Sequence, residues 1–302
     1  MSSGSAGPAP QAPTLPVQNS LRGIGLMCLA FVFFSGLDAV AKLLGQSYPV
    51  GQVVWARFAV HAVVAILLIA PYLGERPWRS ERPVLQAMRG LLLVAATVAN
   101  FTALRYLQLA ETSAIFFASP LIVAALSMPL LGEHVGPRRW AAIVVGFIGV
   151  MIVVRPGLGL AHWAVGLSLL TALIGALYNI LSRKLAGADG AHTTQFYTAM
   201  VAAVATAPLL TAGWTPPTAG GWLLMALAGI FGGLGHWLLA VAHSYAPAPI
   251  LAPFSYTQIL WMPLLGYLVF ADVPSAWTAA GAAVVVASGL YLLHRERVVK
   301  GV

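Results

Sequence analysis

Ten long apolar stretches fill almost the whole of this 302-residue chain, and the connections between them are too short to hold a soluble domain. A helix needs roughly 20 apolar residues to cross a hydrocarbon layer about 30 Å thick. We therefore expect an all-α integral membrane protein with ten transmembrane helices, whose functional site lies between them. The predicted spans cover residues 21–44, 49–72, 83–104, 110–131, 137–154, 162–184, 191–211, 219–243, 247–270 and 275–294.

The composition excludes an ordinary water-soluble domain. Charged residues make up 8% and hydrophobic residues 60% of the chain, whereas soluble domains carry roughly 25% charged residues. The net charge of +8 is spread along the helix ends, so it indicates the lipid bilayer and not nucleic acid as the partner. The single cysteine, Cys28, cannot form an intrachain disulfide. Residues 1–20 are rich in Pro, Ser, Gly and Ala and are expected to form a disordered tail before an uncleaved first span.

The basic residues are distributed unequally between the two sides of the membrane. Twelve of the 16 fall on one side of the predicted topology, and the others are Lys42, Arg57, Arg105 and Arg155. Cytoplasmic connections carry the excess of Lys and Arg in membrane proteins. Both termini, including the short tail at 295–302, are therefore expected to be cytoplasmic.

The two halves of the chain resemble each other weakly. A constant spacing of 139 residues relates Tyr106 to Tyr245 and the acidic Glu133 to the acidic Asp272. Because each half holds five spans, an odd number, two such repeats must lie in opposite orientations in the membrane, as in many secondary transporters. We expect two five-helix inverted repeats around a central cavity, over residues 21–155 and 162–294.

Several short motifs carry a resemblance to a known family. The run from Ala103 to Tyr106, the later Pro120, the Leu-Leu-Gly-Glu run that ends at Glu133, and Arg57 resemble the first repeat of the EamA branch of the drug/metabolite transporter superfamily. The resemblance covers about residues 21–295. Within the superfamily the chain looks most like bacterial exporters of aromatic and neutral amino acids, the YddG type. The resemblance implies a multi-pass protein of the bacterial plasma (inner) membrane, with a cavity lined largely by the third, fourth, eighth and ninth spans.

The second half departs from this pattern at two positions. Ile259 stands where Pro120 has its counterpart, and Asp272 replaces a glutamate. The resemblance therefore extends to the fold more firmly than to individual residues of the second repeat.

Charged side chains inside the predicted spans are candidates for function because they are expensive in a bilayer. Asp38 and Lys42 are four residues apart and are expected to pair on one helix face. Arg57 shares a face with His61, four residues further on. This group is interpreted either as a site for the carboxylate or ammonium of an amino acid or as a structural cluster that joins two helices. The histidines His61 and His236 are either proton carriers or neutral, hydrogen-bonded side chains.

Polar and aromatic residues of the fourth and ninth spans form the second candidate surface. The 139-residue spacing relates Ser119 to Gln258, and Gln258 is expected near the midplane, where an unpaired amide is costly. Neighbouring aromatic residues either line the cavity or anchor the helices at the interface. The predicted substrate-binding residues are Gln258, Tyr256, Ser255, Ser119, Trp261, Tyr178, Trp237, Arg57 and His61.

Prolines crowd the same two spans. Pro120 and Pro129 lie in the fourth, and four prolines including Pro253 and Pro263 lie in the ninth. Each removes a backbone donor and strains the preceding turn. We expect bends there, which serve either as gating hinges or as static kinks.

The residue patterns of metal sites, phosphate-binding loops and catalytic triads do not stand out in this sequence, so neither a cofactor nor an enzymatic activity is predicted. The leading interpretation is a secondary transporter that exports small metabolites, most simply neutral and aromatic amino acids, by alternating access. The alternatives are an intramembrane enzyme acting on a lipid or isoprenoid, and a passive channel or structural membrane subunit. The sequence leaves open the coupling ion and the oligomeric state.

Overall fold

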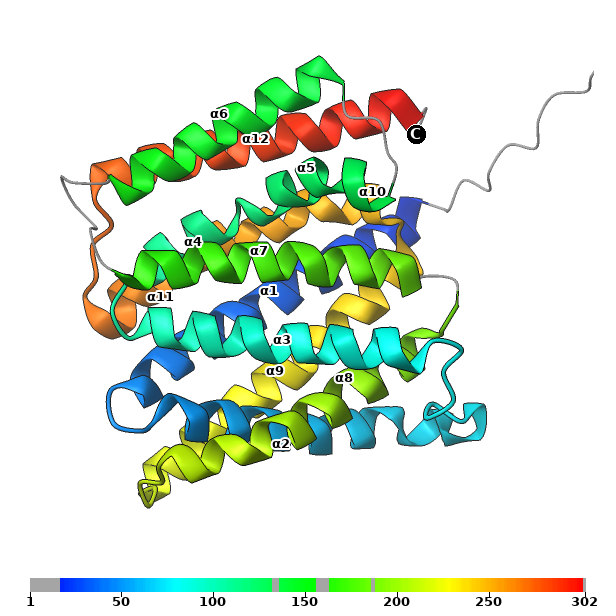
Figure 1. Ribbon diagram of the computed structural model, residues 1–302, viewed down its shortest axis with the longest axis vertical. Coiled ribbons are helices and arrows are strands. Elements are labelled where there is room, and N and C mark those ends of the chain that lie inside the picture. The colour runs from blue at the N-terminus through cyan, green and yellow to red at the C-terminus, as the bar shows by residue number, and fades with distance from the viewer. Residues whose placement is uncertain (1–16, 132–135, 156–162, 186–187, 301–302) are drawn as a thin grey trace, which may run out of the picture.

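The computed structural model describes residues 17–131, 136–155, 163–185 and 188–300, and the regular elements of these residues are helices (Figure 1). The predicted N-terminal tail lies mostly outside the described residues, and α1 begins at Val17, inside the stretch predicted as disordered. The helices are α1 Val17–Gly45, α2 Val50–Ile69, η1 Ala70–Glu75, α3 Pro83–Leu104, α4 Leu109–Phe116, α5 Ser119–Leu131, α6 Pro137–Val154, α7 Trp163–Leu185, α8 Ala191–Thr206, η2 Ala207–Ala212, α9 Ala219–Tyr245, α10 Ala248–Leu251, η3 Ala252–Thr257, α11 Gln258–Phe270 and α12 Ala276–Lys300.

In the described part of the chain, eight helical stretches are long and apolar enough to cross a membrane, with α4 and α5 counted as one. The predicted seventh and ninth spans are also helical, but neither is a single long helix. The seventh is the 16-residue α8 followed by the short η2. The ninth is divided into α10, η3 and α11. The chain is therefore a multi-pass, all-helical membrane protein, as the hydropathy pattern predicts.

Proline explains where two of the spans are interrupted. The fourth span breaks between Phe116 and Ser119, and Pro120, the second residue of α5, lacks the N–H that would continue the helical hydrogen bonds across the break. In the ninth span Pro253 lies in the first turn of η3, where its missing N–H costs least. Both spans are thus interrupted near a proline, whereas Pro129 and Pro263 lie inside α5 and α11.

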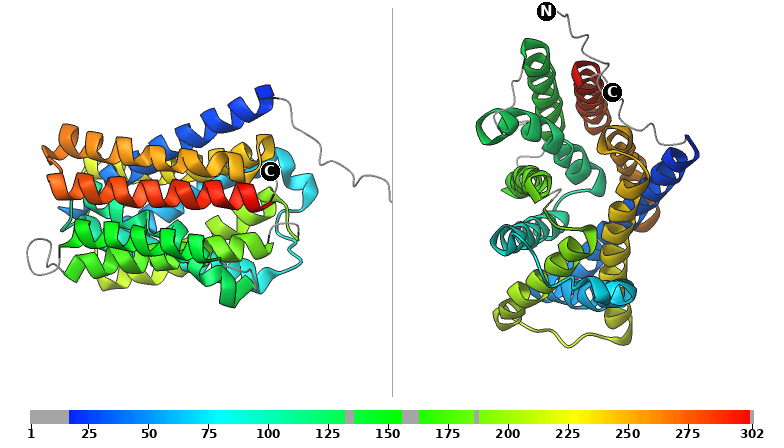
Figure 2. Two further views of the ribbon diagram at one scale, coloured as in Figure 1. Left: turned by 90° about the horizontal axis from the view of Figure 1, so that it is seen from above. Right: turned by 90° about the vertical axis from the view of Figure 1, so that its right-hand side faces the viewer.

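The helices lie side by side along one common direction (Figures 1 and 2). The pair α2 and α8 forms one edge of the bundle, and the pair α6 and α12 forms the opposite edge. Between them α1 packs against α9 and α3 against α7. The start of α1 and the C-terminus lie at the same end of the bundle (Figure 1).

Glycines allow the closest helix contacts. On α9, a Cβ on Gly229 would meet Val60 of α2 at 2.3 Å, and one on Gly233 would meet Val64 at 2.8 Å. On the opposite edge, a Cβ on Gly281 of α12 would lie 2.6 Å from the carbonyl oxygen of Gly149 on α6. Small residues at such positions let transmembrane helices approach closely. The glycine run that precedes His236 thus packs closely against neighbouring helices.

Candidate functional site

A layer of polar side chains lies between the central helices, and Arg57 of α2 is its most buried charge. Its side chain is 3% exposed. Nη1 donates a hydrogen bond to Thr97 Oγ1 of α3 at 2.7 Å, and the guanidinium lies 4.2 Å from the ring centroid of Phe58. Nε is buried and has no hydrogen-bond partner in the described part of the chain. Arg57 therefore retains an unused donor inside the bundle.

Asp38 of α1 faces α3, where Asn100 Nδ2 donates a hydrogen bond to Asp38 Oδ1 at 2.9 Å. The expected pairing of Asp38 with Lys42 is wrong. Lys42 Nζ lies 2.7 Å from Asp272 Oδ2 instead. Asp38 and Lys42 share a face of α1, but Lys42 lies one turn closer to the end of this helix. There the connection between α11 and α12 supplies the carboxylate of Asp272.

His61 and His236 stack on each other between α2 and α9. Their ring centroids are 5.5 Å apart and the rings are inclined by 7°. His61 is completely buried, and neither of its ring nitrogens has a partner within the described residues. Their positions bring the predicted pair Arg57 and His61 together with His236, which also lies within electrostatic reach of Arg57.

Arg89 of α3 belongs to the same polar layer, although the sequence pattern assigns it only to the cytoplasmic excess of basic residues. Nε donates to Ser182 Oγ at 2.7 Å and Nη1 donates to Thr198 Oγ1 at 2.6 Å. Nη2 donates to the hydroxyl of Tyr178, and the guanidinium also lies over the Tyr178 ring. Tyr178 in turn lies within electrostatic reach of Arg57. The predicted site residue Tyr178 thus contacts Arg89 directly, through its hydroxyl and its ring.

The residues predicted from the ninth span lie in a second group. Ser255 Oγ donates to the carbonyl of Ala252 at 2.7 Å, so its hydroxyl is used within η3. Gln258 is buried at the start of α11. Trp261 Nε1 and Ser119 Oγ are buried without hydrogen-bond partners in the described part of the chain. Two of these residues, Trp261 and Ser119, therefore carry polar groups that no described residue satisfies.

Tyr256 and Trp237 have well-defined packing partners. Tyr256 stacks on Phe117 at 4.8 Å between ring centroids, and its hydroxyl lies against Gly289 of α12. The Trp237 and His192 rings are tilted by 31° with 5.9 Å between their centroids, and Trp237 also packs with apolar residues of α2 and α8. The structure thus distributes the predicted residues over several helix contacts instead of one surface.

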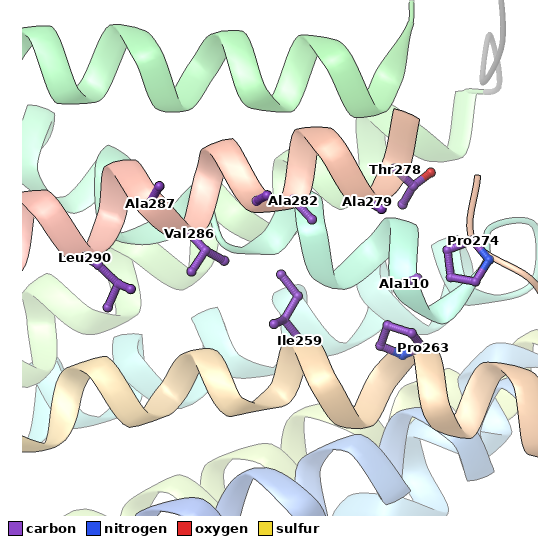
Figure 3. Close-up of a pocket in the computed structure, with 11 residues that line it drawn as sticks. Ala110, Ile259, Pro263, Pro274, Thr278, Ala279, Ala282, Val286, Ala287 and Leu290 are labelled. Carbon is purple, nitrogen blue, oxygen red and sulfur yellow. The ribbon is translucent and has the colours of Figure 1, made fainter. Parts of the chain in front are cut away.

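A half-open pocket of about 540 Å³ lies between α4, α11 and α12 (Figure 3). Its walls are apolar apart from the hydroxyl of Thr278. None of the predicted site residues lines this pocket. Its lining residue Ile259 directly follows the predicted site residue Gln258 in the sequence. The lining residues are Ala110, Ile259, Pro263, Pro274, Thr278, Ala279, Ala282, Ala283, Val286, Ala287 and Leu290.

Nothing in the described residues resembles a metal centre, because no three His, Cys, Asp or Glu side chains gather within ligand range. Buried charges between membrane-spanning helices commonly mark substrate or ion pathways in membrane proteins. In agreement, residues 21–155 and 162–294 each match the EamA-like transporter family. The chain belongs to this family.

The curated relatives of this EamA-like protein are named after different substrates. The chain is 27% identical to an S-adenosylmethionine uptake transporter of Rickettsia bellii, over 91% of this chain and 94% of that one. It is 28% identical to a riboflavin transporter of Rhizobium johnstonii, with 94% and 95% covered, and 28% identical to the pseudopaline exporter CntI of Pseudomonas aeruginosa, with 91% and 97% covered. The protein is a membrane transporter of the EamA drug/metabolite type.

The fold is also found in a solved crystal structure. That structure aligns with a TM-score of 0.62 at 20% identity, over 92% of this chain and 98% of the other. At this identity the likeness describes the fold alone.

Proposed function

We propose that this EamA-like transporter is a secondary exporter of small amphiphilic metabolites, with neutral and aromatic amino acids as its first substrates, and that it works by alternating access in the bacterial inner membrane. The observation that carries the proposal is the unpaired polar layer around Asp38 and Arg57. These two opposite charges lie in adjacent spans without a direct ion pair, and each retains capacity for another partner. Buried charges of this kind mark substrate pathways in membrane proteins.

The chemistry of the layer suits a zwitterion. A carboxylate such as Asp38 accepts hydrogen bonds from an ammonium group, and the guanidinium of Arg57 donates to a carboxylate. Aromatic residues such as Tyr178 and Trp261 offer apolar surface for the rest of the substrate, as in most small-molecule sites. The names of the relatives include both uptake transporters and an exporter, so the export direction in this proposal follows from the resemblance to YddG-type exporters.

The proposal includes ten membrane crossings in two inverted repeats, over residues 21–155 and 162–294, with both termini in the cytoplasm. The packing supports this arrangement. In the proposed repeats, α1, α2 and α3 of the first half correspond to α7, α8 and α9 of the second half. The contact of α1 with α9 then has its counterpart in the contact of α7 with α3. The contact of α2 with α9 likewise becomes that of α8 with α3. An even number of crossings also agrees with the two chain ends lying at one end of the bundle (Figure 1).

Transport assays with purified protein in liposomes test the proposal. Vesicles loaded with unlabelled phenylalanine should take up labelled phenylalanine faster than empty-lipid controls, and the exchange should saturate and be inhibited by other neutral amino acids. The Asp38→Asn variant should retain its folded yield and lose most of this exchange. If no amino acid of a broad panel is exchanged above the control, the amino-acid assignment is wrong.

A further inference from the structure

Two buried arginines in the membrane-spanning helices lack a carboxylate partner. Arg57 and Arg89 are 3% and 7% exposed. Among the described residues, no carboxylate oxygen lies within 4.0 Å of either guanidinium, and their hydrogen bonds go to the hydroxyl groups of Thr97, Ser182, Thr198 and Tyr178. Neutral hydroxyls accept hydrogen bonds from some of the N–H donors but form no ion pair, and for Arg57 the opposite charge of Asp38 acts only from a greater distance. A buried charge without a direct ion pair is unfavourable.

The two arginines lie at different depths. Arg57 is seven residues from the start of α2, which places it about 10 Å from that end of the helix at 1.5 Å per residue. Arg89 is six residues from the start of α3, about 9 Å from the opposite face, because consecutive spans run in opposite directions. In a layer about 30 Å thick the Cα atoms of the two arginines are thus separated by about 10 Å along the membrane normal.

Tyr178 connects the two positions. Its hydroxyl accepts a hydrogen bond from Arg89 Nη2, and the residue lies within electrostatic reach of Arg57. His236 of α9 likewise lies within electrostatic reach of both arginines. The hydrogen bonds join the two cations through α3, which carries both Thr97, the partner of Arg57, and Arg89, whose partners Ser182 and Tyr178 lie on α7.

We propose that Arg57 and Arg89 are successive binding positions for one anionic group of the transported substrate, so that a carboxylate is a required part of that substrate. This rests on the proposed transport function and assigns its specificity. The free Nε of Arg57 supplies the donor at one depth. At the other depth, Arg89 can exchange its neutral hydroxyl partners for a carboxylate, which forms the stronger, charge-assisted bonds. The position of Arg89 closer to the predicted cytoplasmic end makes it the first of the two to meet an exported substrate.

The proposal separates molecules that differ only in this group. Phenylalanine and phenylalaninamide share the ring and the ammonium group, but only the acid can neutralise a guanidinium. Phenylalanine should be exchanged across liposomes at least ten times faster than phenylalaninamide at equal concentration. Equal rates for the two compounds would overturn the assignment of the arginines while leaving the transport function intact.

Variants of Arg89 test whether this arginine recognises the carboxylate of the substrate. Arg89→Gln should raise the KM for phenylalanine at least tenfold. The KM of Arg89→Lys should lie between those of the parent protein and Arg89→Gln, because lysine retains the charge but loses the bidentate geometry. Arg138→Gln, at an exposed position at the start of α6, is the matched control and should behave as the parent protein. An unchanged KM in a folded Arg89→Gln protein would contradict the proposal.

A binding measurement distinguishes failure of this inference from failure of the transport function. Phenylpropionate, a carboxylate without an ammonium group, should raise the melting temperature of the purified parent protein, whereas phenylpropionamide should not. Arg89→Lys and Tyr178→Phe should each show a smaller shift. If phenylpropionate stabilises the protein through Arg89 but no amino acid is exchanged, only the proposed transport function fails. If the acid and the amide act alike, the anion site is wrong whatever the transport assays give.

Discussion

Lys42 of α1 and Asp272, two residues after α11, form an ion pair with 2.7 Å between Nζ and Oδ2. Lys42 Nζ also donates to the carbonyl of Leu107 between α3 and α4, at 3.1 Å, and lies 4.7 Å from the ring centroid of Phe270. One side chain thus ties together three segments that are far apart in the chain. It does so at the end of the bundle opposite to the two chain ends.

Breaking this pair should destabilise the fold. The Lys42 and Asp272 side chains are 12% and 24% exposed, so the pair is neither fully buried nor fully exposed. An exposed ion pair contributes up to about 1 kcal/mol, whereas disruption of a buried pair costs about 3–5 kcal/mol. Asp272→Asn should therefore lose about 1–3 kcal/mol and melt at a lower temperature in detergent. Reversing both charges, in Lys42→Asp with Asp272→Lys, should recover part of the loss. Lys184→Met is the control at an exposed lysine, and a parent-like Asp272→Asn protein would show that the pair does not stabilise the fold.

The contact between α6 and α12 should be intolerant of added volume. A Cβ on Gly281 would lie 2.6 Å from the backbone oxygen of Gly149 and 2.9 Å from the nitrogen of Val153. Backbone atoms cannot move aside, so Gly281→Ala should cost about 1–3 kcal/mol, the usual range for overpacking. Melting temperatures measure this effect. Gly166→Ala on α7 meets nothing within 4 Å and should be neutral or stabilising, and equal behaviour of the two variants would contradict the close contact.

The sequence predicted the helices well because the length and apolar character of a span are local properties. Partner choice is not local. Lys42 has Asp38 four residues away but binds Asp272, 230 positions further on, and only the packing of α1 against α11 reveals this. Arg89 was missed as a site residue for a related reason, because its position in the second turn of α3 is that of an ordinary basic residue near a helix end.

The residues predicted from the ninth span have different surroundings, and the backbone that carries them is not one regular α-helix. Residues 252–257 form the 3₁₀ segment η3, which has about 3.0 residues per turn instead of 3.6. The direction of each side chain after this segment therefore differs from that in an uninterrupted helix. Tyr256 turns towards Gly289 of α12, and Gln258 is at the first position of α11. The prolines indicated a break, but its effect on side-chain direction required the structure.

The connection between α7 and α8 should make stability depend on pH in the acid range. Burial of Asp189 acts to raise its pKa, but hydrogen bonds from Ser80 Oγ, Gln86 Nε2 and the Glu81 backbone nitrogen outweigh it, so the pKa is lowered from its ordinary value. A lowered pKa in the folded state adds stability above the unfolded value of about 4, and this is lost as the pH falls through the folded pKa.

The comparison of Asp189→Asn with the parent protein isolates this contribution. The difference between their melting temperatures should be largest at neutral pH and shrink as the pH falls below about 4. Ser80→Ala, which removes one donor to the carboxylate, should cost about 1–3 kcal/mol at neutral pH. If the difference in melting temperature between Asp189→Asn and the parent protein stays constant from neutral to acid pH, the Asp189 charge does not stabilise the connection between α7 and α8.

The hydroxyl of Tyr256 should be dispensable for folding, although its ring is not. The hydroxyl is buried against Gly289 without a hydrogen-bond partner in the described part of the chain, whereas the ring stacks on Phe117. An unsatisfied buried group costs about 1–3 kcal/mol, so Tyr256→Phe should melt at the same or a higher temperature than the parent protein. Tyr256→Ala should lose about 3–5 kcal/mol by analogy with other large core truncations.

Flux measurements on the same variants decide whether this part of the ninth span meets the substrate. Gln258→Ala should fold normally and lose most of its amino-acid exchange, because we expect its buried amide to serve the substrate. Tyr256→Phe should exchange at the parent rate, and Tyr267→Phe, at a 60% exposed position of α11, is the matched control. Normal melting combined with lost flux in Tyr256→Phe would mean that the hydroxyl reaches the substrate in another conformation of the transporter. Normal flux in Gln258→Ala would move the site entirely to the polar layer around Arg57.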